Sequence, residues 1–243
     1  MKRWILALLL GLLTVPALAA GRLAQVDLID AHSGRTLPVY YDQGRYYVAG
    51  VPGREYSIRI RNRSHTDLLA VVSVDGVNVV TGETAAVDQG GYILGKRQRF
   101  DIKGWRKSLE QVASFYFSNL DDSYASRTGR PDNVGVIGVA LFKRKVELPF
   151  FEGFSSAPEP AAPRARESEE RSEDAARLGT GHGRRQNSVV RYGEFERESA
   201  SPNEIVTIYY DSRANLVARG IIPVVRTIPH PFPSGFVADP PNG

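Results

Sequence analysis

Residues 56–61 alternate strictly between apolar and polar side chains, and this pattern constrains the fold more than any other feature of the sequence. Tyr56, Ile58 and Ile60 fall on one side of an extended chain, and the polar residues between them fall on the other. A period of two is typical of a β-strand with one face buried and the other in water. We therefore expect a half-buried strand here.

Other short β-prone runs, separated by turn residues, lie on both sides of this strand. Residues 68–74 are continuously apolar and predict a strand covered on both faces, and Asp75-Gly76 after them is a strong hairpin signal. No long helical periodicity separates the runs, so we predict an all-β fold, an antiparallel β-sandwich or jelly roll, over residues 23–148. The further runs cover residues 25–29, 37–41, 45–48, 77–80, 92–94, 98–102, 112–117 and 134–142.

The first 19 residues have the order of a secretory signal peptide. Lys2 and Arg3 precede an apolar run over residues 4–15, and Ala17-Leu18-Ala19 supplies the small residues that a signal peptidase reads. The run is shorter than the roughly 20 residues of a membrane span. We therefore expect cleavage after Ala19 rather than a retained anchor, and a periplasmic or secreted protein of a Gram-negative bacterium.

The composition narrows the classes of function. The chain has no cysteine, which excludes a lipidated cysteine anchor, disulfides and a thiol nucleophile, so the fold must depend on a hydrophobic core. Loss of residues 1–19 lowers the net charge from +4 to +2, with 29 basic and 27 acidic side chains remaining. This small excess does not indicate a nucleic-acid partner, and we expect no membrane anchor after cleavage.

The composition changes sharply near residue 155. Residues 155–177 have no aromatic or β-branched side chain, so we predict a disordered charged linker over 155–178. Residues 204–210 then predict a strand, and a short helix should follow Asp211 or Ser212 and end before Gly220. The segment 179–228 is too small for a core of its own, so we expect it to dock on the sandwich, with 205–210 added at a sheet edge. The tail 229–243 is rich in proline.

Several sequence blocks resemble an uncharacterised family of exported Gram-negative bacterial proteins. They are SVDGVNVVTGE at 73–83, GWRKS at 104–108, TGRPDNVG at 128–135, LGTGHG at 178–183 and YYDS at 209–212. The resemblance implies an exported domain family, and it brings no activity, cofactor or catalytic residue.

The first candidate site is the GWRKS block. Trp105 stands beside Arg106 and Lys107, which suggests a platform for a glycan or an anionic polymer through stacking and charge-assisted hydrogen bonds. The structural alternative, which we favour, is a tryptophan that closes one end of the sandwich.

The second candidate is the loop that carries Arg127, Arg130 and Asp132. With Asp121 and Asp122 it offers oxygen ligands for Ca²⁺, but the spacing is not that of an EF-hand. We favour an Arg–Asp network that orders a long loop.

The third candidate is GTGHGRR at 179–185. Its glycines can turn backbone N–H groups toward an anion, with His182 as acid or base and Arg184 as a clamp. It is neither a Walker loop nor a dinucleotide fingerprint, so we favour a flexible glycine-rich loop that docks on the sandwich. The histidines have no zinc-ligand spacing, and we expect neither a metal nor a cofactor.

These observations favour an exported, non-enzymatic β-sandwich that binds an envelope protein or a cell-envelope polymer such as a polysaccharide. One alternative is an envelope-acting hydrolase that uses His182 with Asp132 or Asp211, and another is a structural subunit of a secreted assembly. The ligand-binding candidates are Trp105, Arg106, Arg127, Arg130 and Arg184.

Overall fold

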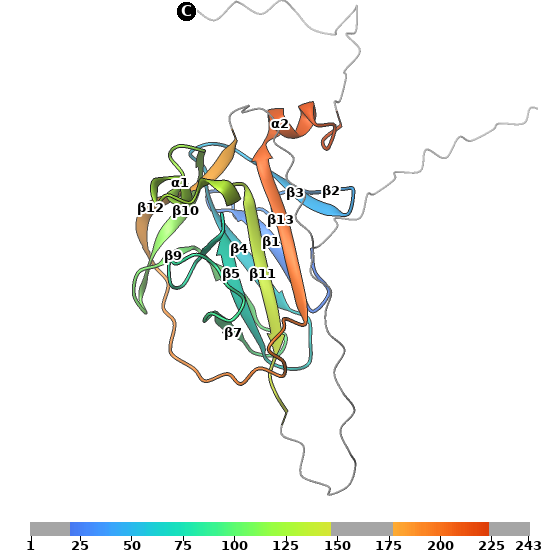
Figure 1. Ribbon diagram of the computed structural model, residues 1–243, viewed down its shortest axis with the longest axis vertical. Helices are drawn as coiled ribbons and strands as arrows, with labels where there is room; N and C mark the ends of the chain where they lie inside the picture. The colour runs from blue at the N-terminus through green and yellow to red at the C-terminus, as the bar shows by residue number, and fades with distance from the viewer. Residues whose placement is uncertain (1–19, 147–176, 224–243) are drawn as a thin grey trace, which may run out of the picture.

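The computed structural model describes residues 20–146 and 177–223 as two β-sheets packed face to face (Figure 1). The predicted signal peptide, the predicted tail and all but the last two residues of the predicted linker lie outside the described residues. Within the described ranges no helix is long and apolar enough to span a membrane. The predicted all-β sandwich is confirmed.

One sheet has six strands and the other has seven. In the six-stranded sheet the order is β1-β4-β10-β12, with β8 paired to β4 and β9 paired to β10; in the other it is β2-β3-β13-β11-β5-β6, with β7 paired to β5. The strands are β1 (Ala24–Asp30), β2 (Val39–Asp42), β3 (Arg45–Gly50), β4 (Glu55–Asn62), β5 (Leu68–Val74), β6 (Val77–Asn78), β7 (Tyr92–Leu94), β8 (Arg99–Ile102), β9 (Gly104–Arg106), β10 (Gln111–Asn119), β11 (Val136–Lys143), β12 (Leu178–Asn187) and β13 (Glu204–Ser212).

The core lies between the two sheets. In β4, the side chains of Tyr56, Ile58 and Ile60 are buried in it, as the alternating pattern predicts. The strand β5 is covered on both faces: Val72 belongs to the main core, whereas Leu69 belongs to a second cluster on the outer face. The predicted doubly covered strand is therefore confirmed.

The C-terminal segment contributes strands to both sheets. β12 forms an edge of the six-stranded sheet beside β10. β13 lies inside the seven-stranded sheet, antiparallel to β11 and parallel to β3. The expectation that residues 205–210 would add at a sheet edge was wrong for residues 208–210, because β3 covers the other side of this strand from Ile208 onward. The predicted helix is α2 (Arg213–Ala218), capped by the Ser212 hydroxyl, which accepts a hydrogen bond from Asn215 N.

The glycine-rich stretch 179–183 forms part of β12, and the prediction of a flexible loop was wrong. The reason lies in the neighbouring strand. A Cβ at Gly181 would overlap the ring of Tyr116, and one at Gly183 would overlap Ser114. The glycines therefore leave room for side chains of β10 that pack against the strand.

Candidate functional site

One cavity is a groove of about 980 Å³ between the ends of the two sheets and residues 188–198, which we call the strap. The strap belongs to the connection between β12 and β13. Figure 1 shows this connection as an orange line that runs from β12 around one end of the sandwich to the start of β13. The strap therefore forms one wall of the groove, and β7 and β8 contribute to the others.

Arginine side chains hold the strap at both ends. Arg106 donates hydrogen bonds to Ser188 O at 2.5 Å and to Tyr92 Oη at 3.1 Å. Arg197 donates to three carbonyl oxygens of the 87–89 loop at 2.6–3.0 Å, and its guanidinium lies 4.1 Å from the ring centre of Phe142. Backbone bonds add to the attachment: Ser188 N donates to Glu110 O, Val190 N to Leu109 O, Lys145 N to Glu196 O and Glu198 N to Lys143 O.

The groove combines apolar side chains with unpaired cations. Its rim exposes Leu109, Val189 and Tyr192, of which Val189 is 70% and Tyr192 is 90% exposed. Lys107 and Arg191 also line it, and their side chains make no hydrogen bond or ion pair with any residue in the described ranges. Exposed apolar area next to uncompensated charge is typical of a surface that another molecule covers.

A second basic feature lies beside the groove, at the end of the sandwich formed by β9, β12 and α1 (Tyr124–Arg127). The Tyr124 ring packs between Trp105, at 4.8 Å, and His182, at 5.6 Å between ring centres. Burial lowers the pKa of His182, and the charges of Lys107, Arg127 and Arg185 lower it further. At neutral pH the imidazole is therefore uncharged and surrounded by cations, and Lys107 links this basic cluster to the groove.

Three of the predicted residues, Trp105, Arg127 and His182, lie together in this cluster. Trp105 is only 3% exposed and donates a hydrogen bond from Nε1 to Gly181 O at 3.3 Å. Its ring packs in the interior against Tyr124 and does not form a platform at the surface. His182 and Arg127 are exposed. Arg106 lies next to the cluster, in the wall of the groove.

Two other predicted arginines have partners elsewhere. Arg184 forms a bidentate pair with Glu55 at 2.9 and 3.1 Å, and this pair lowers the pKa of Glu55. Arg130 donates to Gly82 O and to the Thr128 hydroxyl. The predicted Arg–Asp network was wrong, because no ion pair joins these loop residues in the part of the chain that the structure describes. Instead, the Ser123 hydroxyl caps α1 by accepting from Ser126 N.

The two candidate aspartates lie apart from His182. Asp132 is exposed on a short 3-10 helix, Pro131–Asn133. Asp211 accepts hydrogen bonds from Ser212 N and the Asn215 amide at the start of α2. Among the described residues no hydrogen bond or ion pair joins His182 to a carboxylate, and no group of three or more acidic or histidine side chains could hold a metal ion.

A buried polar network in the core was not predicted from the sequence. Asp75 accepts hydrogen bonds from Tyr210 Oη at 2.5 Å, Thr180 N at 2.8 Å and Gly135 N at 3.0 Å. Because the Tyr210 proton points at Asp75, the Thr180 hydroxyl must donate to Tyr210, and the Tyr56 hydroxyl must donate to Thr180. The hydroxyl groups therefore form a chain in which Tyr56 donates to Thr180, Thr180 donates to Tyr210 and Tyr210 donates to the carboxylate of Asp75.

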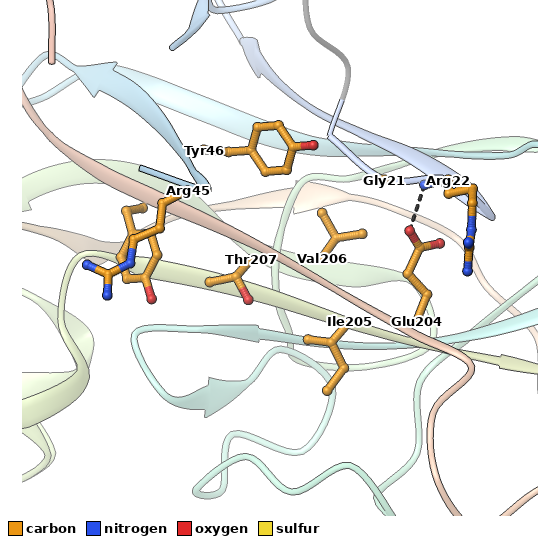
Figure 2. A pocket seen from close by; sticks show the side chains of 10 residues that line it. Gly21, Arg22, Arg45, Tyr46, Glu204, Ile205, Val206 and Thr207 are labelled. Carbon is orange, nitrogen blue, oxygen red and sulfur yellow. Dashed lines mark hydrogen bonds between the residues drawn. The ribbon is translucent and has the colours of Figure 1, made fainter. Parts of the chain in front are cut away.

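A smaller cavity of about 430 Å³, which we call the notch, opens beside β13. Figure 2 shows Glu204, Ile205, Val206 and Thr207 along β13, with Arg22 near one end of this stretch and Arg45 near the other. The dashed line marks the hydrogen bond from Arg22 N to the Glu204 carboxylate, 2.7 Å long. A second backbone donor, Leu23 N, reaches the same carboxylate at 2.5 Å.

Comparison with known proteins adds no relative to this picture. No protein-family model matches the chain, and neither the curated proteins nor the solved structures include a match. The resemblance described from the sequence blocks therefore stays a prediction.

Proposed function

We propose that this is an exported, non-enzymatic binding protein, and that its groove receives an acidic, partly apolar segment of a partner protein in the cell envelope. The observation that carries the proposal is the combination of exposed Leu109, Val189 and Tyr192 around one cavity with Lys107 and Arg191, whose side chains have no partner among the described residues. Tyrosine and apolar side chains supply contact area in protein interfaces, and complementary charge selects the partner. Export rests on the sequence of residues 1–19.

A partner protein accounts for the groove better than a polysaccharide does. A saccharide that binds by stacking needs an accessible aromatic face, but the ring of Tyr92 is buried and the guanidinium of Arg106 covers it at 5.6 Å. Tyr192 alone offers an exposed ring on the strap. The aliphatic side chains around it match an apolar peptide segment instead.

The proposal is tested by capture from envelope extracts with the mature protein immobilised. A double charge reversal, Lys107→Glu with Arg191→Glu, should abolish capture of the specific partner. The matched control reverses two exposed cations outside the groove, Arg35→Glu with Lys96→Glu, and should capture as the unchanged protein does. Mass spectrometry identifies the retained protein.

Three results would contradict the proposal. One is that nothing is retained, and another is that the groove variant and the control variant retain the same material. The third is that the retained material survives complete protease digestion, which would identify a polysaccharide as the ligand. Salt dependence provides a further check, because binding through exposed charges weakens as ionic strength rises.

A further inference from the structure

Within the described residues, no strand pairs with the outer edge of β13 along its first residues. Pairing with β3 begins only at Ile208, which lies opposite Tyr46, because β3 starts at Arg45 after a tight turn with Gly44 at φ 79°. Glu204–Thr207 therefore extend beyond the start of β3. This uncovered stretch of edge forms one wall of the notch.

The direction of the open peptide groups follows from the ladder with β11. Tyr210 N donates to Gly135 O in the chain before β11. Peptide groups in a strand point alternately to its two neighbours, so even-numbered residues of β13 face β11 and odd-numbered residues face β3. Ile205 consequently directs its N–H and C=O groups into the notch and Thr207 directs its N–H there, and no strand of the described chain receives these groups. The Thr207 C=O is already used, because the parallel pairing of Ile208 with Tyr46 places Tyr46 N against it.

The side chains around the notch favour an acidic ligand. The guanidinium of Arg22 makes no hydrogen bond or ion pair among the described residues, and Arg45 adds a second cation that lies 5.7 Å from the Tyr209 ring centre. Glu204 is the one carboxylate in the lining, and both of its oxygens already accept backbone N–H groups. Ile205 is 59% exposed and provides apolar contact beside these charges.

We propose that the notch binds a short, extended, acidic peptide of a partner protein. The peptide continues the seven-stranded sheet beyond the start of β3: its backbone pairs with Ile205 and with the N–H of Thr207, and its carboxylate side chain meets Arg22. Strand addition of this kind obtains affinity from main-chain hydrogen bonds and specificity from the flanking side chains. The notch is distinct from the groove, since β11 and β5 lie between β13 and β7 in the sheet.

The test uses the isotope-labelled mature protein and a defined probe, the acetylated and amidated peptide Thr-Val-Asp-Val-Thr. Amide NMR signals of Ile205 and Thr207 should shift in a saturable way, with a Kd below about 1 mM. Two modified peptides separate the contributions. N-methylation of the three central residues should weaken binding at least tenfold, and replacement of the aspartate by asparagine should weaken it about threefold to tenfold.

Protein variants provide the matched comparison. Arg22→Glu should weaken binding of the aspartate peptide at least fivefold, whereas Arg35→Glu, at another exposed cation, should leave it unchanged. The proposal is overturned if 1 mM peptide causes no shift at Ile205 and Thr207, or if the N-methylated peptide binds equally well. Shifts confined to the strap would overturn it as well, but would support ligand binding in the groove, so the two proposals fail separately.

Discussion

Asp75 is both a turn residue of a hairpin and a buried acceptor of hydrogen bonds. It occupies a turn with φ 53°, followed by Gly76 at φ 73°, as the hairpin signal predicts. Its side chain is fully buried and accepts bonds from residues before β11, in β12 and in β13. Burial raises the pKa of this carboxyl to about 6, and the hydrogen bond from Tyr210 acts in the opposite direction.

The pKa of Asp75 predicts a pH-dependent stability. Because the folded-state value lies above the ordinary 3.8, the folded protein takes up a proton near pH 6, before the unfolded chain does. The free energy of unfolding should therefore increase by roughly 1 kcal/mol from this group as the pH falls from 7.5 to 5. Urea unfolding at the two pH values measures the change.

Asp75→Asn should remove this pH step. At pH 7.5, where Asp75 is ionised, the variant should also be less stable by about 1–3 kcal/mol, because the amide cannot accept every bond that the carboxylate accepts. Asp27→Asn is the control, since the pKa of Asp27 is also raised by burial but its site lies in β1. A pH step that persists in Asp75→Asn and disappears in Asp27→Asn would contradict this prediction, because it would show that Asp27 is the group that titrates.

Residue by residue, the sequence predicted positions whose signal is local and missed those whose role depends on distant partners. The turn at Asp75-Gly76 and the cap at Ser212 are local and were predicted. The burial of Asp75 depends on Thr180, 105 positions away. Lys107 was noted beside Trp105, but its position in the groove depends on the path of the strap.

At the level of elements, β12 shows how a neighbouring strand determines the residues of an edge strand. Gly181→Ala should reduce the free energy of unfolding by about 1–3 kcal/mol, because its Cβ would overlap the Tyr116 ring. Gly90→Ala should change it by less than about 0.5 kcal/mol, since nothing lies within 4 Å of a Cβ there. Equal effects of the two substitutions in urea unfolding would contradict this explanation.

The strap is an element without regular structure, so its stability should depend on its few anchors. Arg106→Ala removes the bonds to Ser188 and Tyr92. We expect trypsin to cleave after Arg191 at least tenfold faster in this variant, with little change in the global unfolding temperature. Arg35→Ala, at an exposed arginine far from the strap in sequence, should leave the cleavage rate unchanged. Unaltered cleavage in Arg106→Ala would show that other contacts hold the strap.

The elements that the sequence predicted well are those with a clear apolar period, such as β4 and β5. It misassigned β12 because glycines normally indicate a loop, and the Tyr116 ring that requires them lies in another strand. It placed β13 at an edge because strand order is not encoded in any local pattern. The parallel pairing of β13 with β3 joins residues about 160 positions apart.

For the whole molecule, the C-terminal strands complete both sheets. β12 pairs with β10 from Leu178 to Asn187, and β13 separates β3 from β11. Removal of β13 would leave two strand edges unpaired in the middle of a sheet and expose core residues such as Val206 and Ile208. The part of the chain before residue 147 should therefore not fold stably alone, although it contains most of the strands.

This dependence predicts the result of cutting the chain between β11 and β12. A specific protease site inserted near residue 165 should be cleaved without loss of the native fold, and both fragments should elute together in gel filtration. In 8 M urea they should separate, and the isolated N-terminal fragment should aggregate or show no cooperative unfolding on return to buffer. Mixing the two fragments should restore the fold at a rate that depends on their concentrations. Separate elution of a folded N-terminal fragment would show instead that the first eleven strands form a stable sandwich, with β12 and β13 as an accessory layer.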